Sequence, residues 1–126
     1  MTYLLDTNII VDFTRGNAEA AVYLDGLGGA CLLSSITALE LIAGARSQRE
    51  VSDLDVMISA YGQIAPTPDI ARRAYYLMKT HAKSAGLQTL DSLIAATALE
   101  EGLTLATKNR RHFQMIEDLK LEVPGY

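Results

Sequence analysis

The sequence lacks several features that would assign it to a specialised class of protein. Its 126 residues include no tryptophan, one cysteine, three prolines and no apolar stretch near the roughly 20 residues that a membrane-spanning helix needs. The lone Cys31 excludes a disulfide framework, and its apolar neighbours predict a buried, small hydrophobic side chain. The N-terminus has no basic segment and carries Asp6 where a signal peptide would be apolar. These absences predict a cytoplasmic protein that does not associate with a membrane.

An excess of positive charge is also missing. The formal net charge is −4, whereas a protein that binds nucleic acid by bulk electrostatic attraction is usually basic. This balance does not exclude an enzyme that gathers carboxylates around a metal ion and keeps its cations local. For each local group of cations, a solvated helix face is the simpler interpretation. The groups are Arg46 and Arg49, Arg72 and Arg73, Lys79 and Lys83, and Lys108 with Arg110 and Arg111.

Hydrophobic residues, by contrast, are plentiful. They make up 49% of the chain, which is enough for the core of one compact domain over residues 1–126. Short apolar runs of strand length alternate with segments of helical periodicity. The predicted strands are residues 3–6, 30–34, 63–65 and 103–107, with an edge strand in the tail after Glu117. This alternation, with strands apolar on both faces, predicts an α/β fold with a parallel sheet covered by helices on both sides.

Capping residues divide the rest of the chain into helices. The expected helices cover residues 8–15, 18–27 and 35–45, a segment from Ser47 to Gly62, and residues 68–85 and 90–101. The predicted N-caps are Asn17, Ser47, Thr67 and Thr89. The glycines expected to end helices are Gly16, Gly28 with Gly29, Gly62, Gly86 and Gly102.

Three acidic residues lie in unexpectedly apolar surroundings. Asp6 ends the first strand, Glu40 lies between two leucines, and Asp91 precedes an apolar turn of its helix. Each also has a structural interpretation. Asp6 could cap the following helix, Thr37 and Glu40 match a capping box, and Asp91 suits the positive end of a helix dipole.

Taken together, these acids favour a functional interpretation. Each follows a strand or begins a helix after a loop, and in a parallel sheet such junctions point to the same edge. Three carboxylates that converge there would repel one another unless they shared a cation. Oxygen ligands of this kind suit Mg²⁺ or Mn²⁺. A metal ion that activates water and stabilises charge on a phosphate is suited to phosphodiester hydrolysis.

The segment 106–113 follows the last central strand and is expected at the same edge. Asn109 could supply a neutral oxygen, and Thr107 could orient a water molecule. The backbone of a nucleic acid could be held by three cations, namely Lys108, Arg110 and Arg111.

Other side chains have a functional and a simpler interpretation. His112 is a candidate general base, although a surface or loop-packing role is simpler. His81 has the spacing of a structural residue within its helix. Tyr75 and Tyr76 could stack on bases, although an aromatic residue on such a helix usually packs in the core.

Four motifs then resemble those of PIN-domain proteins, and more narrowly those of VapC-type toxin ribonucleases of bacterial toxin–antitoxin pairs. In order they are Leu4-Leu5-Asp6-Thr7-Asn8, Ser35-Ile36-Thr37-Ala38-Leu39-Glu40-Leu41, Leu90-Asp91-Ser92-Leu93-Ile94-Ala95-Ala96 and Ala106-Thr107-Lys108-Asn109. The resemblance spans essentially the whole chain. It implies a three-layer α/β/α fold with a mostly parallel sheet of four to five strands. It also implies a Mg²⁺- or Mn²⁺-dependent endoribonuclease, a cognate antitoxin that blocks the site, and often a homodimer.

The resemblance also implies roles for individual residues. Asp6 and Asp91 would bind the metal ion, Glu40 would complete the acidic cluster, and Asn109 would act with them in catalysis. Contacts to the RNA substrate are expected from Thr7, Asn8, Thr107, Lys108 and Arg110. Asn109 is a departure, because many family members carry a fourth acidic residue at this position. A neutral Asn binds a metal ion more weakly, so one ion is expected to be well held and a second would arrive with substrate.

Two other functions compete with metal-dependent RNA cleavage. A PIN-like module that binds RNA or a partner protein without turnover is supported by Asn109. An aspartyl-phosphate domain would be either a phosphatase of the haloacid-dehalogenase type or a receiver. The phosphatase needs a second Asp at the position where this chain has Asn8. The receiver needs a Lys after a late strand, which Lys108 could supply, but it also needs paired acids near its first strand, and these are missing.

Overall fold

A single parallel sheet forms the middle layer of the protein. The structure, a computed structural model, describes residues 1–28 and 30–126. Its sheet has five strands in the order β3-β2-β1-β4-β5, and every neighbouring pair is parallel. The strands are β1 (Tyr3–Leu5), β2 (Cys31–Ser34), β3 (Gly62–Ile64), β4 (Thr104–Ala106) and β5 (Leu121–Glu122). The prediction of a mostly parallel sheet of four to five strands is therefore confirmed.

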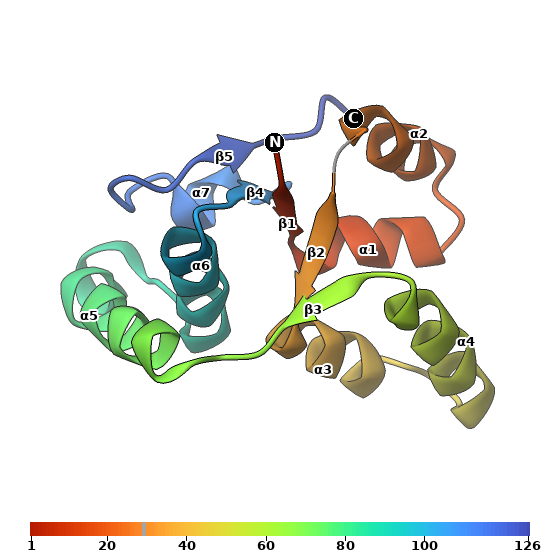
Figure 1. The fold of residues 1–126 in the computed structure, drawn as a ribbon, viewed down its shortest axis with the longest axis horizontal. Coiled ribbons are helices and arrows are strands. Elements are labelled where there is room, and N and C mark those ends of the chain that lie inside the picture. The colour runs from red at the N-terminus through yellow and green to blue at the C-terminus, as the bar shows by residue number, and fades with distance from the viewer. Residues whose placement is uncertain (29) are drawn as a thin grey trace.

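Helices cover both faces of this sheet. In the described part of the chain they are α1 (Thr7–Thr14), α2 (Ala18–Leu27), α3 (Ser35–Ala43), α4 (Gln48–Ser59), α5 (Pro68–Ala85), α6 (Thr89–Glu101) and α7 (Arg110–Phe113). Figure 1 shows α5 and α6 on one side of the sheet and α1, α2 and α4 on the other. The predicted three-layer α/β/α architecture is thus confirmed. Of the helices in the described ranges, none is long and apolar enough to cross a membrane.

Side-chain caps fix where several helices begin. The side chains of Asn17, Ser47 and Thr67 each accept a hydrogen bond from the backbone amide three residues later, at 3.1 Å. These bonds satisfy amides that have no partner within the helix, so the three predicted N-caps are confirmed. Thr89 was wrongly predicted as a cap. It is the first residue of α6, and Gln88 precedes it without a side-chain capping bond.

Glycines confirm most of the predicted helix ends, with one exception. Gly28, Gly86 and Gly102 adopt the left-handed conformation that ends a helix, while Gly29 lies outside the described residues. Gly62 does not end α4, which stops at Ser59, but begins β3. A Cβ atom at this position would lie 2.7 Å from the Leu32 side chain on the paired strand, so glycine allows this close strand contact.

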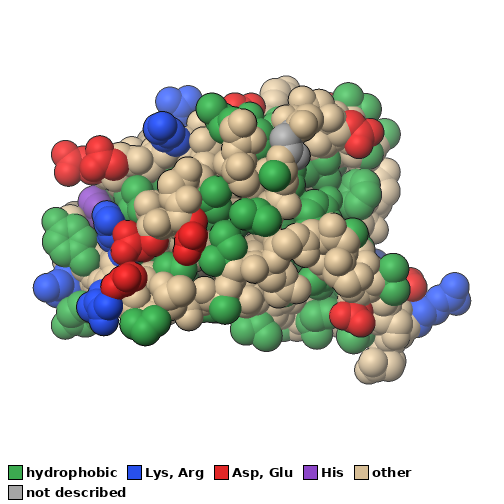
Figure 2. Space-filling view, in the orientation of Figure 1, with side chains coloured by type: hydrophobic (Ala, Val, Ile, Leu, Met, Phe, Trp, Pro, Cys, Tyr) green, Lys and Arg blue, Asp and Glu red, His purple; other side chains and the backbone are tan. Residues whose placement is uncertain are grey.

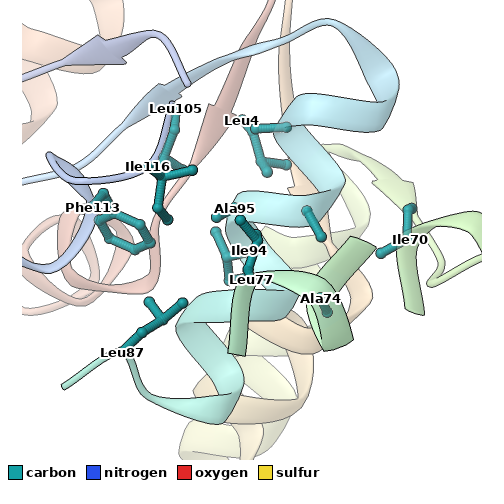
Figure 3. Close-up of a cluster of buried hydrophobic side chains, with 12 residues drawn as sticks. Leu4, Ile70, Ala74, Leu77, Leu87, Ile94, Ala95, Leu105, Phe113 and Ile116 are labelled. Atoms are coloured by element: carbon teal, nitrogen blue, oxygen red, sulfur yellow. The ribbon is translucent and has the colours of Figure 1, made fainter. Parts of the chain in front are cut away.

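Two hydrophobic clusters hold the layers together, one on each face of the sheet. Successive side chains of a strand point to opposite faces, so Leu4 joins the cluster beneath α5 and α6, whereas Leu5 joins the cluster beneath α1, α3 and α4. Figure 3 shows the first cluster, in which Leu105 and Ile94 lie beside Leu4. Both faces of the central strands are therefore dry, as their continuous apolar sequences predict.

We expect Leu105→Ala to lower the free energy of unfolding by about 2–5 kcal/mol, because it removes a fully buried side chain from the core. Leu39→Ala is the matched control. Leu39 is 66% exposed, so its truncation should change stability by no more than about 0.5 kcal/mol. Urea unfolding followed by circular dichroism measures both values. Equal effects of the two variants would contradict the assignment of the core.

Candidate active site at the carboxyl edge of the sheet

The strand order creates a crevice between the ends of two central strands. The chain passes from β1 outward through β2 to β3, and then returns to place β4 on the other side of β1. Ligands of open α/β sheets bind at such a reversal, outside the carboxyl ends of the strands. Asp6 directly follows β1, and Thr107 directly follows β4. The backbone amide of Asp6 also donates to the carbonyl of Ala106 at 2.9 Å, which joins the two strand ends.

Asp6 is buried in this crevice and is held by several donors. Its side chain is only 5% exposed. Oδ1 accepts a hydrogen bond from the Thr7 amide at 2.8 Å, and Oδ2 accepts bonds from the Thr107 hydroxyl at 2.7 Å and the Asn8 side-chain amide at 3.4 Å. Asp6 is also the N-cap of α1. Asp6 can therefore be both a helix cap and a site residue. One carboxylate oxygen caps α1, while the carboxylate as a whole lies in the crevice.

Glu40 reaches the same crevice from α3. The hydroxyl of Thr7 donates to Oε1 of Glu40 at 2.7 Å, which couples the acid after β1 to the acid on α3. The capping-box interpretation of Thr37 and Glu40 is wrong. The N-cap of α3 is Ser34, whose hydroxyl accepts from the amide of Ile36 at 3.0 Å, and Glu40 lies in the second turn of the helix.

Asp91 approaches from the first turn of α6 and contacts a histidine. Nδ1 of His112 lies 3.1 Å from Oδ2 of Asp91. The His112 side chain is about half exposed, with 52% accessible, so it is a surface residue as the simpler interpretation predicted. Because it also contacts an acid of the crevice, loop packing alone does not describe it.

Nine residues line one hollow of about 370 Å³ at this edge. They are Asp6, Thr7, Asn8, Val11, Asp12, Glu40, Asp91, Asn109 and His112. The structure therefore brings together the four residues predicted for catalysis, along with Thr7 and Asn8. Thr107 lies behind them and is fully buried, whereas Lys108 and Arg110 are exposed and do not line the hollow.

The Thr107 hydroxyl, which the sequence suggested could orient a water molecule, is bonded to two groups of the protein. It donates to Asp6 and also accepts a hydrogen bond from the amide of Asn109 at 2.9 Å. With both interactions made inside the protein, the hydroxyl fixes Asp6 and the start of the following loop relative to each other. We therefore interpret Thr107 as a residue that positions the site.

Asp12 belongs to this edge, and sequence reasoning missed it. Its Oδ2 accepts from the Lys108 ammonium group at 2.6 Å and from the Tyr126 hydroxyl at 3.1 Å. The Lys108 ammonium group also lies 5.1 Å from the centre of the Tyr126 ring. The four-residue spacing from Asn8 could have suggested Asp12, because it places both on one side of α1. No local signal could have identified Tyr126, which is distant in sequence.

Burial and neighbouring charges shift the pKa values of Asp6 and Asp91. Burial raises the pKa of Asp6 above its ordinary value, the hydrogen bonds from Thr107 and Thr7 oppose that shift, and the charges of Asp91 and Glu40 raise the pKa further. Burial also raises the pKa of Asp91, while His112 lowers it. A cation in the hollow would relieve both the desolvation and the repulsion.

The donors fit a hard divalent ion that keeps much of its water. Carboxylates and an amide oxygen are the ligand types of Mg²⁺ and Mn²⁺, and Asp6, Glu40, Asp91 and Asn109 supply them. Over residues 1–28 and 30–126, no three His, Cys, Asp or Glu side chains are close enough together to hold one ion between them. Mg²⁺ usually retains several waters and takes only one or two carboxylates directly, so this spacing is compatible with it.

Comparison with known proteins now assigns the class to which this fold and site belong. The model of the PIN domain family matches residues 3–118, so the chain belongs to the PIN-domain family. It is 40% identical over 121 residues to ribonuclease VapC19 of Mycobacterium tuberculosis, covering 93% of this chain and 96% of that protein. It is 32% identical over 130 residues to the tRNA(fMet)-specific endonuclease VapC of Shigella flexneri, covering 97% of both.

A solved structure confirms the fold. The chain superposes on a chain of a toxin–antitoxin complex from Klebsiella pneumoniae with a TM-score of 0.83 and 30% identity, covering 97% of both chains. The resemblance inferred from four motifs is therefore confirmed over almost the full length of the sequence.

We expect Asp6→Asn to raise the melting temperature of the metal-free protein at pH 8. An acid with a raised pKa in the folded state contributes stability at low pH, and this contribution is lost as the pH rises through the raised pKa. Asparagine keeps the capping oxygen but cannot ionise, so the gain should shrink toward zero in acid. Thermal melts in chelator across this pH range measure it.

Asp55→Asn, at an exposed position on α4, is the control and should show no such pH-dependent gain. A gain for Asp6→Asn that grows toward acid would contradict the direction of the shift.

Proposed function

We propose that this chain is a divalent-metal-dependent endoribonuclease that acts as the toxin of a toxin–antitoxin pair. The observation that carries the proposal is the convergence of Asp6, Glu40 and Asp91 on one hollow at the carboxyl edge of the sheet. Burial of Asp6 among acids that raise its pKa fits a site that needs a cation. The likeness to proteins named ribonuclease and endonuclease supports RNA as the substrate.

In this proposal Asp6 and Asp91 hold the metal ion, Mg²⁺ or Mn²⁺, and Glu40 completes the acidic cluster. The ion, when bound, supplies an activated water molecule and stabilises negative charge on the phosphate. Asp6 is oriented by Thr107, and Glu40 is oriented by Thr7. These fixed partners reduce the reorganisation that metal binding requires. Asn109 offers a neutral oxygen at the rim of the hollow.

The RNA backbone is held by the polar loop after β4. Lys108 and Arg110 are exposed beside the hollow. Arg110 carries charge that phosphates need, while the Lys108 ammonium group reaches a phosphate only by exchanging its ion pair with Asp12 for it. The backbone amide of Lys108 donates to Oδ1 of Asn8 at 3.4 Å, which ties this loop to the start of α1. Thr7 and Asn8 thereby link the acidic cluster to the surface that contacts the substrate.

We expect Asp6→Ala, Glu40→Gln and Asp91→Ala each to lower the rate of RNA cleavage by more than about 100-fold, because loss of groups that merely support metal ligands already costs about 10- to 100-fold. Chelator should abolish cleavage by the wild type, and Mg²⁺ or Mn²⁺ should restore it. The measurement is cleavage of a total RNA preparation followed by sequencing of new 5′ ends. Asp55→Asn is the control, and circular dichroism verifies that each variant is folded. Cleavage retained by all three acid variants would contradict the proposal.

Metal binding separates this function from that of a binding module without turnover. Calorimetric titration of the wild type with Mn²⁺ should show a saturable site that Asp6→Ala and Asp91→Ala weaken, because each removes a carboxylate of the cluster. Absence of site-specific binding, together with absence of cleavage, would favour the PIN-like binding module.

The toxin assignment adds a protein partner, an antitoxin that covers the site. The structural likeness to a chain of a toxin–antitoxin complex supports this part of the proposal. Expression of the chain should arrest bacterial growth, and co-expression of the protein encoded beside it should restore growth. Asp6→Ala should abolish the arrest yet still co-purify with that protein. Growth arrest that survives Asp6→Ala would show that toxicity does not come from the proposed chemistry.

A further inference from the structure

The outer face of α5 differs from the rest of this acidic protein. Tyr75 and Tyr76, expected to pack in the core, are 68% and 59% exposed instead. The core side of α5 is formed by Ile70, Ala74 and Leu77, and the 3.6-residue period therefore turns the two tyrosines outward. The core does not use these rings, so both are accessible at the surface.

Three cations share that outer face. Arg72, Lys79 and Lys83 are exposed and follow one another at spacings of seven and four residues, which align side chains along one side of a helix. The Lys79 ammonium group lies 5.2 Å from the centre of the Tyr75 ring. Figure 2 shows hydrophobic, basic and acidic side chains next to one another at the left of the molecule, where Figure 1 places α5. We call Arg72, Tyr75, Tyr76, Lys79 and Lys83 the α5 stripe.

Most of the positive charge of the stripe is not neutralised within the protein. Arg72 pairs with Asp69 in the first turn of the helix. Among the ion pairs of the described residues, none involves Lys79 or Lys83. These two lysines lie toward the carboxyl end of α5, so the uncompensated charge is at that end.

The same end of α5 leads to the candidate active site. A short connection, residues 86–88, joins α5 to α6, and Asp91 lies in the first turn of α6. The two helices pack against each other in the same layer (Figure 1). From Arg72 to Lys83 the stripe is about 16 Å long at 1.5 Å per residue. Residues 86–88 therefore connect the carboxyl end of the stripe to the helix that carries Asp91.

We propose that the α5 stripe binds single-stranded RNA outside the cleavage site, with Tyr75 and Tyr76 stacking on bases and Lys79 and Lys83 contacting phosphates. This inference rests on the proposed function for the identity of the ligand. Exposed aromatic rings interleaved with cations are the groups by which proteins bind single strands without reading their sequence. A second copy of the chain fits less well as the partner of this stripe. A two-fold interface pairs the same patch of both copies, so the cations of one stripe would face the cations of the other.

Binding is measured by fluorescence anisotropy of a labelled 12-nucleotide RNA in chelator, where cleavage is absent. Tyr75→Ala with Tyr76→Ala should weaken binding at least about fivefold, since loss of one stacked base costs this much or more. Tyr75→Phe with Tyr76→Phe keeps both rings and should bind like the wild type. Lys79→Met with Lys83→Met should reduce the slope of log affinity against log salt by about 1.4, or about 0.7 for each cation. Lys120→Met, an exposed lysine outside the stripe, should preserve the affinity of the wild type.

Kinetics separate this inference from the proposed function. On long RNA the alanine pair should raise KM with kcat unchanged, and on a tetranucleotide that reaches only the hollow both parameters should match the wild type. RNA binding that depends on the stripe without any cleavage would overturn the proposed function and leave this inference standing. Unchanged RNA affinity of the alanine and methionine pairs would overturn the inference. Dissociation of an oligomer by the alanine pair, measured by analytical ultracentrifugation, would overturn it in favour of an interface between copies.

Discussion

The hydrogen bond from Thr107 to Asp6 is the contact on which the organisation of the site depends. It joins side chains that are 101 residues apart and lies at the ends of two adjacent parallel strands. The Thr107 hydroxyl also accepts a hydrogen bond from the amide of Asn109, which connects Asp6 to the loop after β4. Without this bridge, burial would leave one carboxylate oxygen of Asp6 with only the long contact from Asn8. The fold thus satisfies Asp6 while leaving it at the hollow.

Around this hydrogen bond, acidic side chains lie close enough to be mutually unfavourable. Asp6, Glu40 and Asp91 line one hollow, although burial and then the charges of Asp91 and Glu40 raise the pKa of Asp6. Such an arrangement costs stability in the absence of a cation, and the two dry clusters on either side of the sheet offset that cost. The site is therefore unfavourable for the metal-free fold and suited to an ion. Acids with perturbed pKa values cluster at functional sites.

Charge is also distributed unevenly over the whole protein. The net charge of −4 conceals a separation, with acids at the hollow and uncompensated lysines on α5. An acidic centre alone would repel a polyanion, so an RNA-cleaving enzyme needs cations beside it. In our proposals the loop after β4 and the outer face of α5 supply these cations. Bulk charge was therefore a poor guide to the partner, whereas the placement of individual cations is informative.

The sequence by itself determined the elements and the identity of the acids. Periodicity, caps and glycines are local signals, and they located the strands, most helix ends and the parallel α/β class. The four motifs were enough to indicate the family. Tertiary structure alone decided that Thr7 binds Glu40, that Asp12 joins Lys108 and Tyr126, and that Tyr75 and Tyr76 face solvent. The reason is physical. Caps and periodicity depend on residues a few positions apart, whereas side-chain partners and exposure depend on which distant segments the sheet brings together.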